Sequence, residues 1–502
     1  MGQYLIGADI GSSCLKAALV HPERGVVAIS EQFYPMHRPH PGWAQNDAED
    51  WYRALALAVP QVLAEFGVSP SEVAALCLVG QRDIAVLTDE AGRALAPVIH
   101  WTDRRDPDET TAAYGRLGRQ RLIGIAGTLP IPGLVLPNLL WTRRHQPELW
   151  RRVRHALQPK DYLAHRLTGD IGTDPTSPTR SILNDWRTGT WSDDLCDVYG
   201  IPREILPDVT YQPWQVRGEL GVAAGEIGLV PGTLLVAGGG DDPAAALGSG
   251  VIEPGDVSVG TGSSMSWRAV AERPVFDPSG LVGLMPHVVP HHHLHEMVAV
   301  GSGTTLRWLR GALGGDATYE DLIAATDEVG PGCDGLLCFP FIEGTSVPVQ
   351  DDHVRAVFHG ISGHHALPHF VRATLEGIAY QYPALLNALT QRGLRATTLT
   401  ISDGEARSTT WNQIKANVLG HALLPALRVE APSIGAAILA GIGSGTFATA
   451  REGVDAVVEV SDPVEPTPEG YLAYQDLRRD WERSRDQIFP QLAGHAVSLH
   501  LS

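Results

Sequence analysis

A short glycine/serine turn occurs twice in this chain, and the two copies lie half a chain length apart. Gly11-Ser12-Ser13 stands between apolar residues 4–8 and 15–20, and Gly262-Ser263-Ser264 stands between residues 257–259 and 265–267 in a chain of 502 residues. Two short apolar segments joined by such a turn predict a β-hairpin. A hairpin that recurs at half the chain length indicates two similar domains, each of which begins with the same hairpin.

The segments after the first hairpin predict an α/β protein. Apolar residues recur every three or four positions between Asp47 and Phe66, which predicts an amphipathic helix with Asp47 as N-cap, Gly67 as its end and a kink at Pro60. Residues 73–79 predict a buried strand, and helical patterns dominate from about 106 to 167. Strands that alternate with helices are typical of α/β folds. The glycine-rich residues 238–255 place a domain boundary near residue 250.

The overall charge restricts the class of partner. The formal net charge is -19, whereas a nucleic acid or an anionic membrane surface requires a basic face on the protein. The chain has no run of about 18 apolar residues, and strand-like residues follow Met1 directly. The five cysteines are odd in number and scattered, which argues against a disulfide framework. We expect a cytoplasmic protein that binds neither nucleic acid nor membrane.

The first glycine/serine turn has the composition of an anion site. Successive small residues allow backbone N–H groups to point at one phosphate, and the hydroxyls of Ser12 and Ser13 add donors. Asp9 at the end of the preceding strand is placed to hold Mg²⁺ through water, and Lys16 adds a cation across the hairpin. A plain hairpin turn is the alternative. No G-x-x-x-x-G-K-[ST] sequence is present, which excludes a Walker-type site.

Two adjacent carboxylates, Asp241 and Asp242, follow a run of three glycines at 238–240. They would repel a pyrophosphate, so the glycines are a poor match to a dinucleotide-binding turn. A carboxylate beside glycines can instead take the proton from an attacking hydroxyl group. The alternative is structural: one acid caps a helix that begins near Pro243 while the other faces a ligand.

A third polar cluster follows two other strand-like segments. It consists of Gln81, Arg82 and Asp83 after the strand at 73–79, and of Trp101 and Asp103 after the next. Charged and amide groups can bind the polar edge of a hydroxyl-rich ligand while an indole packs against its C–H face. Surface ion pairs around a half-buried tryptophan would leave the same pattern.

Taken in order, these segments resemble the FGGY family of carbohydrate kinases from residue 4 to about residue 474. The resemblance rests on Asp9-Ile10-Gly11-Ser12-Ser13, 42–47, Gly80-Gln81, 99–105, Pro159-Lys160-Asp161-Tyr162, 191–193, 202–207, 238–250, 259–262 and Gly435-Ala436-Ala437. It implies two actin-like domains with a ribonuclease-H-like core around a central cleft, which closes on ATP and a sugar. The expected N-terminal domain, 1–248, binds the sugar and carries the first phosphate hairpin. The expected C-terminal domain, 249–485, binds the nucleotide and precedes a tail at 486–502, and homodimers are usual in the family.

The resemblance also implies roles for individual residues. Asp241 takes the place of the general base, Asp9 organises Mg²⁺, and the sugar is met by the polar cluster together with Asp242. The residues implied to bind ATP are Gly11, Ser12, Ser13 and Lys16 in the first hairpin, Gly260, Thr261 and Gly262 in the second, Gly303 beside it, and Gly404, Glu405 and Ala406 in the adenine loop. Such a reaction needs positioning, charge neutralisation and one base.

Within the family the chain looks most like the xylulokinases, which implies the conversion of D-xylulose to D-xylulose 5-phosphate. Arg82-Asp83, however, stands where xylulokinases carry Met-His, and it is similar to the Arg-Glu pair of glycerol kinases, so glycerol or another short polyol or pentulose is the alternative substrate.

Three further departures from the family pattern concern the ligands. Asp242 replaces an Asn or Gln, and Glu405 adds bulk and charge to the adenine loop. The family's Glu-Arg-Thr-Pro segment reads Gly-Thr-Ser-Val-Pro at 344–348, without the expected ion pair. These changes keep open a second class of function, a sensor that binds sugar or nucleotide with little turnover.

Overall fold

A computed structural model describes residues 3–262, 264–346, 349–351 and 353–493 of the chain. Ser263 of the second predicted turn, Val347 and Pro348 of the departing segment, and residues 494–502 of the predicted tail lie outside the described residues. The chain folds into two compact units. The first comprises Met1–Ile252, Glu272–Leu294 and Glu430–Val458, and the second comprises Glu253–Ala271, His295–Val429 and Glu459–Ser502.

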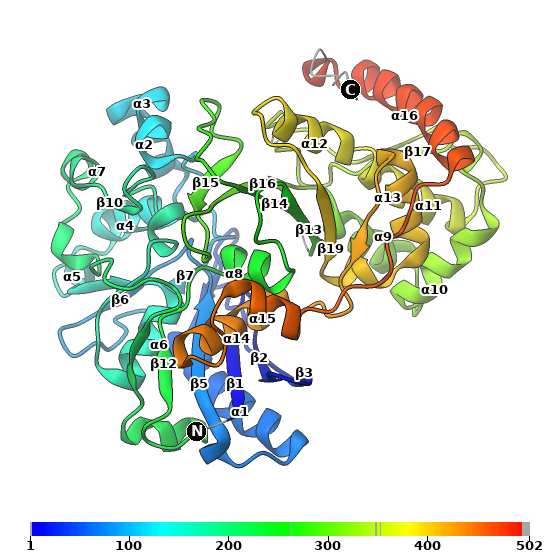
Figure 1. Ribbon diagram of the computed structural model, residues 1–502. Helices are drawn as coiled ribbons and strands as arrows, with labels where there is room; N and C mark the ends of the chain where they lie inside the picture. Colours follow the sequence, from blue (N-terminus) through cyan, green and yellow to red (C-terminus); the bar gives the residue numbers. More distant parts are fainter. Residues whose placement is uncertain (1–2, 263, 347–348, 352, 494–502) are drawn as a thin grey trace. The chain divides into compact units, whose positions relative to one another are not determined.

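The first unit is built on a six-stranded sheet with the order β11-β12-β5-β1-β2-β3 (Figure 1). The strands are β1 (Tyr4–Ile10), β2 (Cys14–His21), β3 (Gly25–Phe33), β5 (Val73–Gly80), β11 (Val216–Glu219) and β12 (Leu234–Val236). β1 and β2 form the predicted hairpin, with Asp9 opposite Lys16. β5 runs parallel to both β1 and β12, so the carboxyl ends of these three strands share one edge of the sheet.

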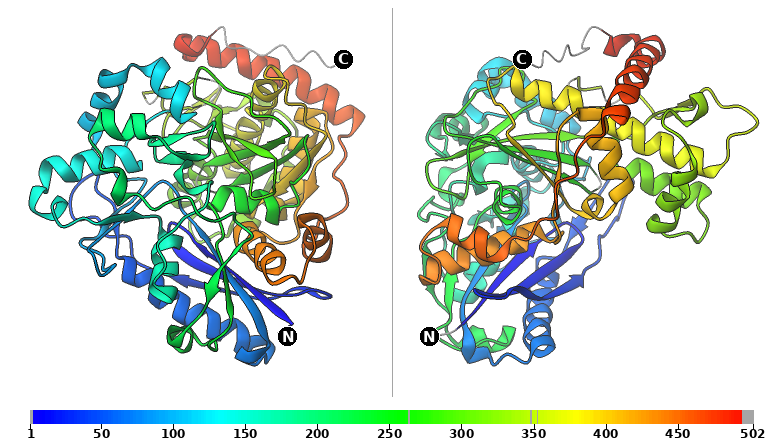
Figure 2. Two further views of the ribbon diagram at one scale, coloured as in Figure 1. Left: turned by 60° about the vertical axis from the view of Figure 1, so that its left-hand side comes forward. Right: turned by 45° about the vertical axis from the view of Figure 1, so that its right-hand side comes forward.

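Helices cover both faces of this sheet. The predicted amphipathic helix is α1 (Ala48–Phe66); Asp47 accepts a hydrogen bond from Glu49 N, and Gly67 ends the helix with a left-handed φ of 70°. The helix continues through Pro60 and packs its apolar stripe against β2 and β3 (Figure 2). On the other face, α14 (Ala431–Ser444) packs against β1 and β5 and also contacts α8 (Asp241–Gly248).

The helical region predicted for residues 106–167 is confirmed. It contains α2 (Pro107–Leu117), α3 (Arg119–Ala126), α4 (Val135–His145), α5 (Pro147–Trp150) and α6 (Pro159–Thr168), with the short strand β8 (His155–Leu157) between α5 and α6. α7 (Asp193–Tyr199) follows, and the side chains of Leu136, Leu139, Leu195 and Tyr199 share one buried apolar core. The indole of Trp101 packs against another core of this unit, which lies between α1 and the sheet.

The second unit repeats the topology of the first. Its central strands are β14 (Met265–Ala271), β13 (Asp256–Thr261), β19 (Thr398–Ser402) and β20 (Leu424–Pro425), in that order, with β16 (His293–Ala299) beside β14. β13 and β14 form an antiparallel hairpin, and β19 runs parallel to β13 and β20. The order β14-β13-β19-β20 therefore corresponds to β2-β1-β5-β12. The repeated turn in the sequence marks a repeated arrangement of strands.

Most of the helices of the second unit lie in the segment after β16. They are α9 (Gly303–Leu313), α10 (Tyr319–Ala324), α11 (Leu367–Ala379), α12 (Tyr382–Thr390), α13 (Thr409–Leu419) and α16 (Pro468–Ile488). α13 packs against both α11 and α16. α15 (Ala450–Val457) belongs to the first unit, where it packs beside α14. Across the described part of the chain, no helix is both long and apolar enough to cross a membrane.

Backbone contact between β1, α14 and α8 fixes the core of the first unit. A Cβ atom on Gly7 would lie 2.0 Å from Ser433 O, and one on Gly435 would lie 2.0 Å from Ala244 O. Only glycine permits backbones to approach this closely, because any Cβ would overlap the facing main chain. The strand that ends near Asp9 and the helix that begins at Asp241 are therefore both positioned against α14.

We expect Gly7→Ala to destabilise the first unit by about 1–3 kcal/mol or more, because the added methyl group overlaps main-chain atoms that cannot rotate away. The measurement is the urea midpoint followed by circular dichroism. Gly218→Ala in β11 is the matched control, since no atom lies within 4 Å of a Cβ at that strand position. A wild-type midpoint for Gly7→Ala would contradict the close packing.

Candidate active site

Three parallel strands bring the predicted polar residues of the first unit to one edge of its sheet. Gln81 N donates to Ile10 O at 3.3 Å, and Gly80 N donates to Gly239 O at 3.4 Å. Asp9, the residues after β5 and the two acids at 241–242 are therefore neighbours, although they are widely separated in sequence. The carboxyl edge of parallel strands is the usual position of a ligand site in α/β folds.

Asp241 and Asp242 form the first turn of α8. The N-cap of this helix is Gly240, and no side chain caps it, so the interpretation of one acid as the N-cap is wrong. Arg82 Nη2 lies 2.9 Å from Asp242 Oδ2, and Arg82 Nε lies 3.7 Å from Asp241 Oδ1. The side chain of Arg82 is 2% exposed, against 30% for Asp241 and 20% for Asp242. A buried cation thus holds two carboxylates that remain accessible.

Arg82 makes further contacts with the protein. Its Nη1 donates to Thr179 Oγ1 at 3.1 Å, and a Cβ on Gly240 would lie 2.6 Å from Arg82 Cδ. Gly240 N in turn donates to the hydroxyl of Thr176 at 2.7 Å. The guanidinium is therefore fixed in place, and it fixes the acids beside it.

The surroundings raise the pKa of Asp241 well above its usual range. Desolvation by the protein packed around the carboxylate is the largest cause, although 30% of the side chain is exposed, and the charge of Asp242 adds to it, while Arg82 acts in the opposite direction. The charge of Asp9 also raises this pKa, so three carboxylates influence one another. A carboxylate with a raised pKa is a stronger base than an ordinary aspartate, which suits proton removal from a hydroxyl group.

A second group of contacts joins the hairpin turn to the predicted sugar cluster. Trp101 Nε1 donates to Ser12 Oγ at 2.9 Å, Ser12 Oγ lies 3.5 Å from Gln81 Oε1, and Gln81 Nε2 donates to Gly11 O at 2.7 Å. Gln81 itself is buried, whereas Ser12 and Trp101 are partly exposed. The half-buried indole and the Ser12 hydroxyl therefore face partly toward solvent beside the turn.

Sequence reasoning missed the short helix at Ser177–Arg180 and the residue before it. Arg180 Nε lies 2.7 Å from Asp83 Oδ1, and Thr176 and Thr179 contact Gly240 and Arg82 as described above. No motif marks this segment, because its role arises only from the tertiary contact with the residues after β5.

The carboxylate of Asp103 is occupied by contacts within the protein. Its carboxylate receives Nε and Nη2 of Arg105 at 2.9 and 2.7 Å and Ala44 N at 2.6 Å, and it is fully buried. The guanidinium of Arg105 lies 3.6 Å from the centre of the Trp43 ring. Asp103 therefore anchors the loop that carries Trp101, and its contact with a sugar stays a prediction.

Asp9 and Lys16 occupy neighbouring positions on the β1–β2 hairpin. Asp9 is 8% exposed, and Lys16 Nζ forms an ion pair with Glu31 at 3.1 Å. Within the part of the chain that the structure describes, no three His, Cys, Asp or Glu side chains are grouped as metal ligands. A Mg²⁺ ion that keeps most of its waters needs only one or two carboxylates. The mutual repulsion of Asp9, Asp241 and Asp242 fits a site that receives a divalent cation.

In the second unit, the residues predicted to bind nucleotide gather at the carboxyl ends of β13 and β19. A Cβ on Gly260 would lie 2.3 Å from Asp403 Oδ2, and one on Gly303 would lie 1.8 Å from Gly262 O. β13 ends at Thr261, and the turn at Gly404–Arg407 follows β19. The Glu405 side chain is buried there and forms an ion pair with Lys415 Nζ at 2.6 Å, so its charge is compensated within the protein.

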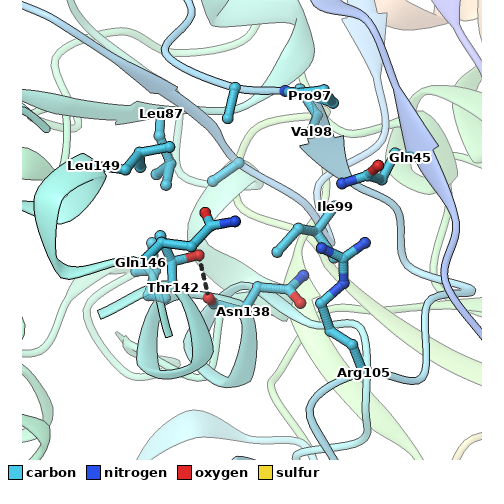
Figure 3. Close-up of a pocket in the computed structure, with 13 residues that line it drawn as sticks. Gln45, Leu87, Pro97, Val98, Ile99, Arg105, Asn138, Thr142, Gln146 and Leu149 are labelled. Carbon is cyan, nitrogen blue, oxygen red and sulfur yellow. Dashed lines mark hydrogen bonds between the residues drawn. The ribbon is translucent and has the colours of Figure 1, made fainter. Parts of the chain in front are cut away.

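A separate cavity of about 60 Å³ lies in the first unit (Figure 3). Its walls combine apolar side chains, among them Leu87 and Leu139, with the polar groups of Gln45, Arg105 and Asn138. None of the residues predicted to bind sugar or nucleotide lines it. The cavity is therefore distinct from the carboxylate site at the sheet edge.

Two units with the same hairpin and parallel-strand order, each with polar residues at the carboxyl edge of its sheet, define a two-domain α/β protein with the actin-like ATPase fold. The models of the N-terminal and C-terminal domains of the FGGY family of carbohydrate kinases match residues 4–248 and 255–444. The chain belongs to this family and is a carbohydrate kinase.

Individual relatives match over nearly the whole chain. A xylulose kinase of Lactococcus lactis is 29% identical over 487 residues, with 96% of each chain covered, and that of Escherichia coli is 29% identical over 493 residues, with 97% of this chain and 100% of the relative covered. The crystal structure of xylulose kinase from Rhodospirillum rubrum superposes with a TM-score of 0.87 at 28% identity, over 97% of this chain and 99% of that one.

Asp106 holds the Trp101 loop against a neighbouring segment and carries a titratable group. Its carboxylate accepts hydrogen bonds from Gly133 N at 3.1 and 3.2 Å, and a Cβ on Gly133 would lie 2.1 Å from Trp101 O. Burial raises the pKa of Asp106 to about 6. The unfolded value is about 3.9, so the folded state prefers the protonated acid.

We expect Asp106→Asn to be more stable than the wild type at pH 8 by about 2–3 kcal/mol, because the ionised carboxylate is buried there while the amide is neutral. The stability that the protonated acid contributes is complete below about pH 4 and is lost as the pH rises through about 6. Urea midpoints between pH 4 and 8 measure the difference. An advantage that does not change with pH would contradict the titration of Asp106.

Proposed function

We propose that this protein transfers the γ-phosphoryl group of ATP to a hydroxyl of D-xylulose, with Asp241 as the general base. The observation that carries the proposal is the pair of accessible carboxylates held by buried Arg82 at the carboxyl edge of the first sheet. The xylulose kinases of two bacteria, similar over almost the full length, support the choice of substrate.

Asp241 would remove the proton from the attacking hydroxyl group. The oxygen then forms its bond to the γ-phosphorus, while the bond from that phosphorus to the β–γ bridging oxygen breaks and ADP leaves. The raised pKa of Asp241 favours its capture of the proton, and the ion pair with Arg82 keeps the carboxylate oriented. After transfer, the proton leaves Asp241 for solvent.

The side chains around Asp241 suit a neutral, hydroxyl-rich molecule. Arg82 and Asp242 compensate each other, as do Arg180 and Asp83, so the cluster offers paired donors and acceptors without an excess positive charge for an acidic substrate. The half-buried indole of Trp101 supplies an apolar surface. Gln81 and Asp103 would act by holding the turn and the Trp101 loop in place.

When bound, ATP would supply the phosphoryl group, and Mg²⁺ would neutralise negative charge during the transfer. We assign Asp9 to Mg²⁺ through water, and Gly11, Ser12, Ser13 and Lys16 to the phosphates. In the second unit, we assign Gly260, Thr261, Gly262 and Gly303 to the phosphates, and Gly404, Glu405 and Ala406 to the adenine.

The first test measures ADP release with Mg-ATP against D-xylulose, L-xylulose, D-ribulose, L-ribulose, xylitol, erythritol and glycerol. We expect D-xylulose to give the highest kcat/KM. A preference for glycerol or erythritol would mean that Arg82-Asp83 selects a short polyol, as their similarity to the glycerol kinases implies. Binding of sugar and nucleotide with no turnover on any of them would favour the sensor alternative.

We expect Asp241→Asn to lower kcat by at least about 10³-fold, because the amide cannot accept the proton. The sugar KM or Kd changes little, since the amide retains the shape of the carboxylate. Gln81→Asn, which alters the turn without removing the base, is the comparison variant and loses far less kcat. Turnover by Asp241→Asn near the wild-type rate would exclude Asp241 as the base.

Asp242→Asn is expected to move the acidic limb of the kcat/KM profile to lower pH. The charge of Asp242 contributes to the raised pKa of Asp241, and only ionised Asp241 can act as a base. Removal of that charge lowers the pKa, so the base remains ionised at lower pH. Profiles between pH 5 and 9 measure the shift, and a limb that moves to higher pH would contradict the coupling between the two acids.

A further inference from the structure

A buried ion pair in the second unit takes no part in the proton and phosphoryl transfers described above. Lys415 Nζ lies 2.6 Å from Glu405 Oε2, and the Tyr382 hydroxyl donates to the same oxygen at 2.9 Å. The side chains of Glu405 and Lys415 are 0% exposed, and Tyr382 is fully buried. Charges so far from solvent persist only with close partners, so the three side chains act as one structural group.

This group comes from three separate elements. Glu405 lies in the turn after β19, Tyr382 begins α12, and Lys415 lies in α13. Asn412, one turn before Lys415 in the same helix, donates from Nδ2 to Ala406 O at 2.9 Å. Side chains of α13 therefore hold the predicted base-binding turn at two points, the Glu405 side chain and the Ala406 main chain.

Tyr382 also connects this turn to the predicted phosphate turn. Trp267 of β14 pairs with Val259 of β13, two residues before Thr261 at the end of that strand. The Tyr382 ring packs edge-on against Trp267 of β14 with ring centres 5.2 Å apart. Tyr382 thus stands between the end of β13 and the turn that follows β19.

Buried polar atoms beside both turns lack hydrogen-bond partners within the described residues. Thr261 Oγ1 and Glu405 Oε1 are buried and accept or donate no hydrogen bond there. Buried polar atoms are normally satisfied by protein, water or ligand. Asp403 between the two turns has a φ of 58°, a strained value for a residue other than glycine, and such strain is concentrated at functional sites.

We propose that Tyr382, Glu405 and Lys415 are positioning residues for the nucleotide. The buried carboxylate, held from two helices, sets the distance between the phosphate turn at 260–262 and the base turn at 404–406, and leaves the Thr261 hydroxyl for the nucleotide. The proposal rests on the proposed function, in which these two turns bind ATP. Glu405 thereby strengthens nucleotide binding instead of repelling it.

The decisive variant is Tyr382→Phe, which removes only the hydroxyl. We expect the Kd for Mg-ADP, measured by isothermal titration calorimetry, to rise at least about tenfold, as the loss of a hydrogen bond to a charged group permits. KM for ATP should rise in parallel, while the KM for sugar stays within about twofold. Calorimetry does not depend on turnover, so it reports on the nucleotide turns alone.

Tyr474→Phe is the matched control. The Tyr474 hydroxyl donates to Glu376 Oε1 at 2.8 Å and accepts from Arg372 Nη2 at 3.1 Å, and the residue is 1% exposed in the same unit. The control loses an equivalent buried contact away from the two turns. We expect Tyr474→Phe to lower the melting temperature about as much as Tyr382→Phe does. Its affinity for Mg-ADP should stay within twofold of the wild type. Equal loss of affinity in both variants would overturn the proposal, since it would indicate general loosening.

If Tyr382→Phe does not fold, the double variant Glu405→Ala, Lys415→Met replaces it, because it removes both charges together and leaves no buried ion unpaired. We expect the same direction of change, at least about fivefold weaker Mg-ADP binding. Wild-type affinity in either folded variant would overturn the inference while the proposed function stands. Failure of the wild type to bind Mg-ADP would overturn the proposed function, and this inference with it.

Discussion

The candidate active site depends on one buried cation. Arg82 is almost inaccessible to water, and an isolated guanidinium in such a position costs several kcal/mol, so the structure is stable only with carboxylates beside it. Asp242 and Asp241 meet that requirement. Because Arg82 lies two residues after the end of β5 and the two acids begin α8, the ion pairs join the end of a central strand to a helix. The position of the proposed base is thus set by the core of the unit, and the partly exposed carboxylates remain available to a ligand.

The second unit also contains a buried pair of opposite charges, at the corresponding place in its own sheet. Glu405 follows β19, which corresponds to β5, and Lys415 compensates its charge from a neighbouring helix. In the first unit the buried partner is the cation, and the acids are accessible. In the second the acid and the cation are both buried, so the pair can hold a turn but cannot exchange a proton with substrate. The same strand order therefore carries the proposed base in one unit and the proposed positioning residues in the other.

Several features of the fold could be predicted from the sequence because they depend on neighbours along the chain. The β1–β2 hairpin, α1 with its Asp47 cap and Gly67 end, and β5 all follow from local periodicity and turn residues. Two other features depend on contacts across the fold. They are the N-cap of α8 and the inclusion of segments 272–294 and 430–458 in the first unit. The helix expected near Pro243 begins at Asp241, with Gly240 as its N-cap, because the glycine meets Thr176 across the fold. α14 joins the first unit through backbone contacts with Gly7 that no local pattern records.

The sequence by itself determined the strand-and-helix content, the repeated hairpin, the family and the two acids at 241–242, since each of these is written in residues close together or in ordered motifs. Only the tertiary structure decided which charges pair. Arg180 with Asp83, Arg82 with Asp242 and Lys415 with Glu405 are partners because strand order and helix packing place them within about 3 Å of each other. Charge pairing depends on distance in space, and periodicity and turn chemistry report only on distance along the chain.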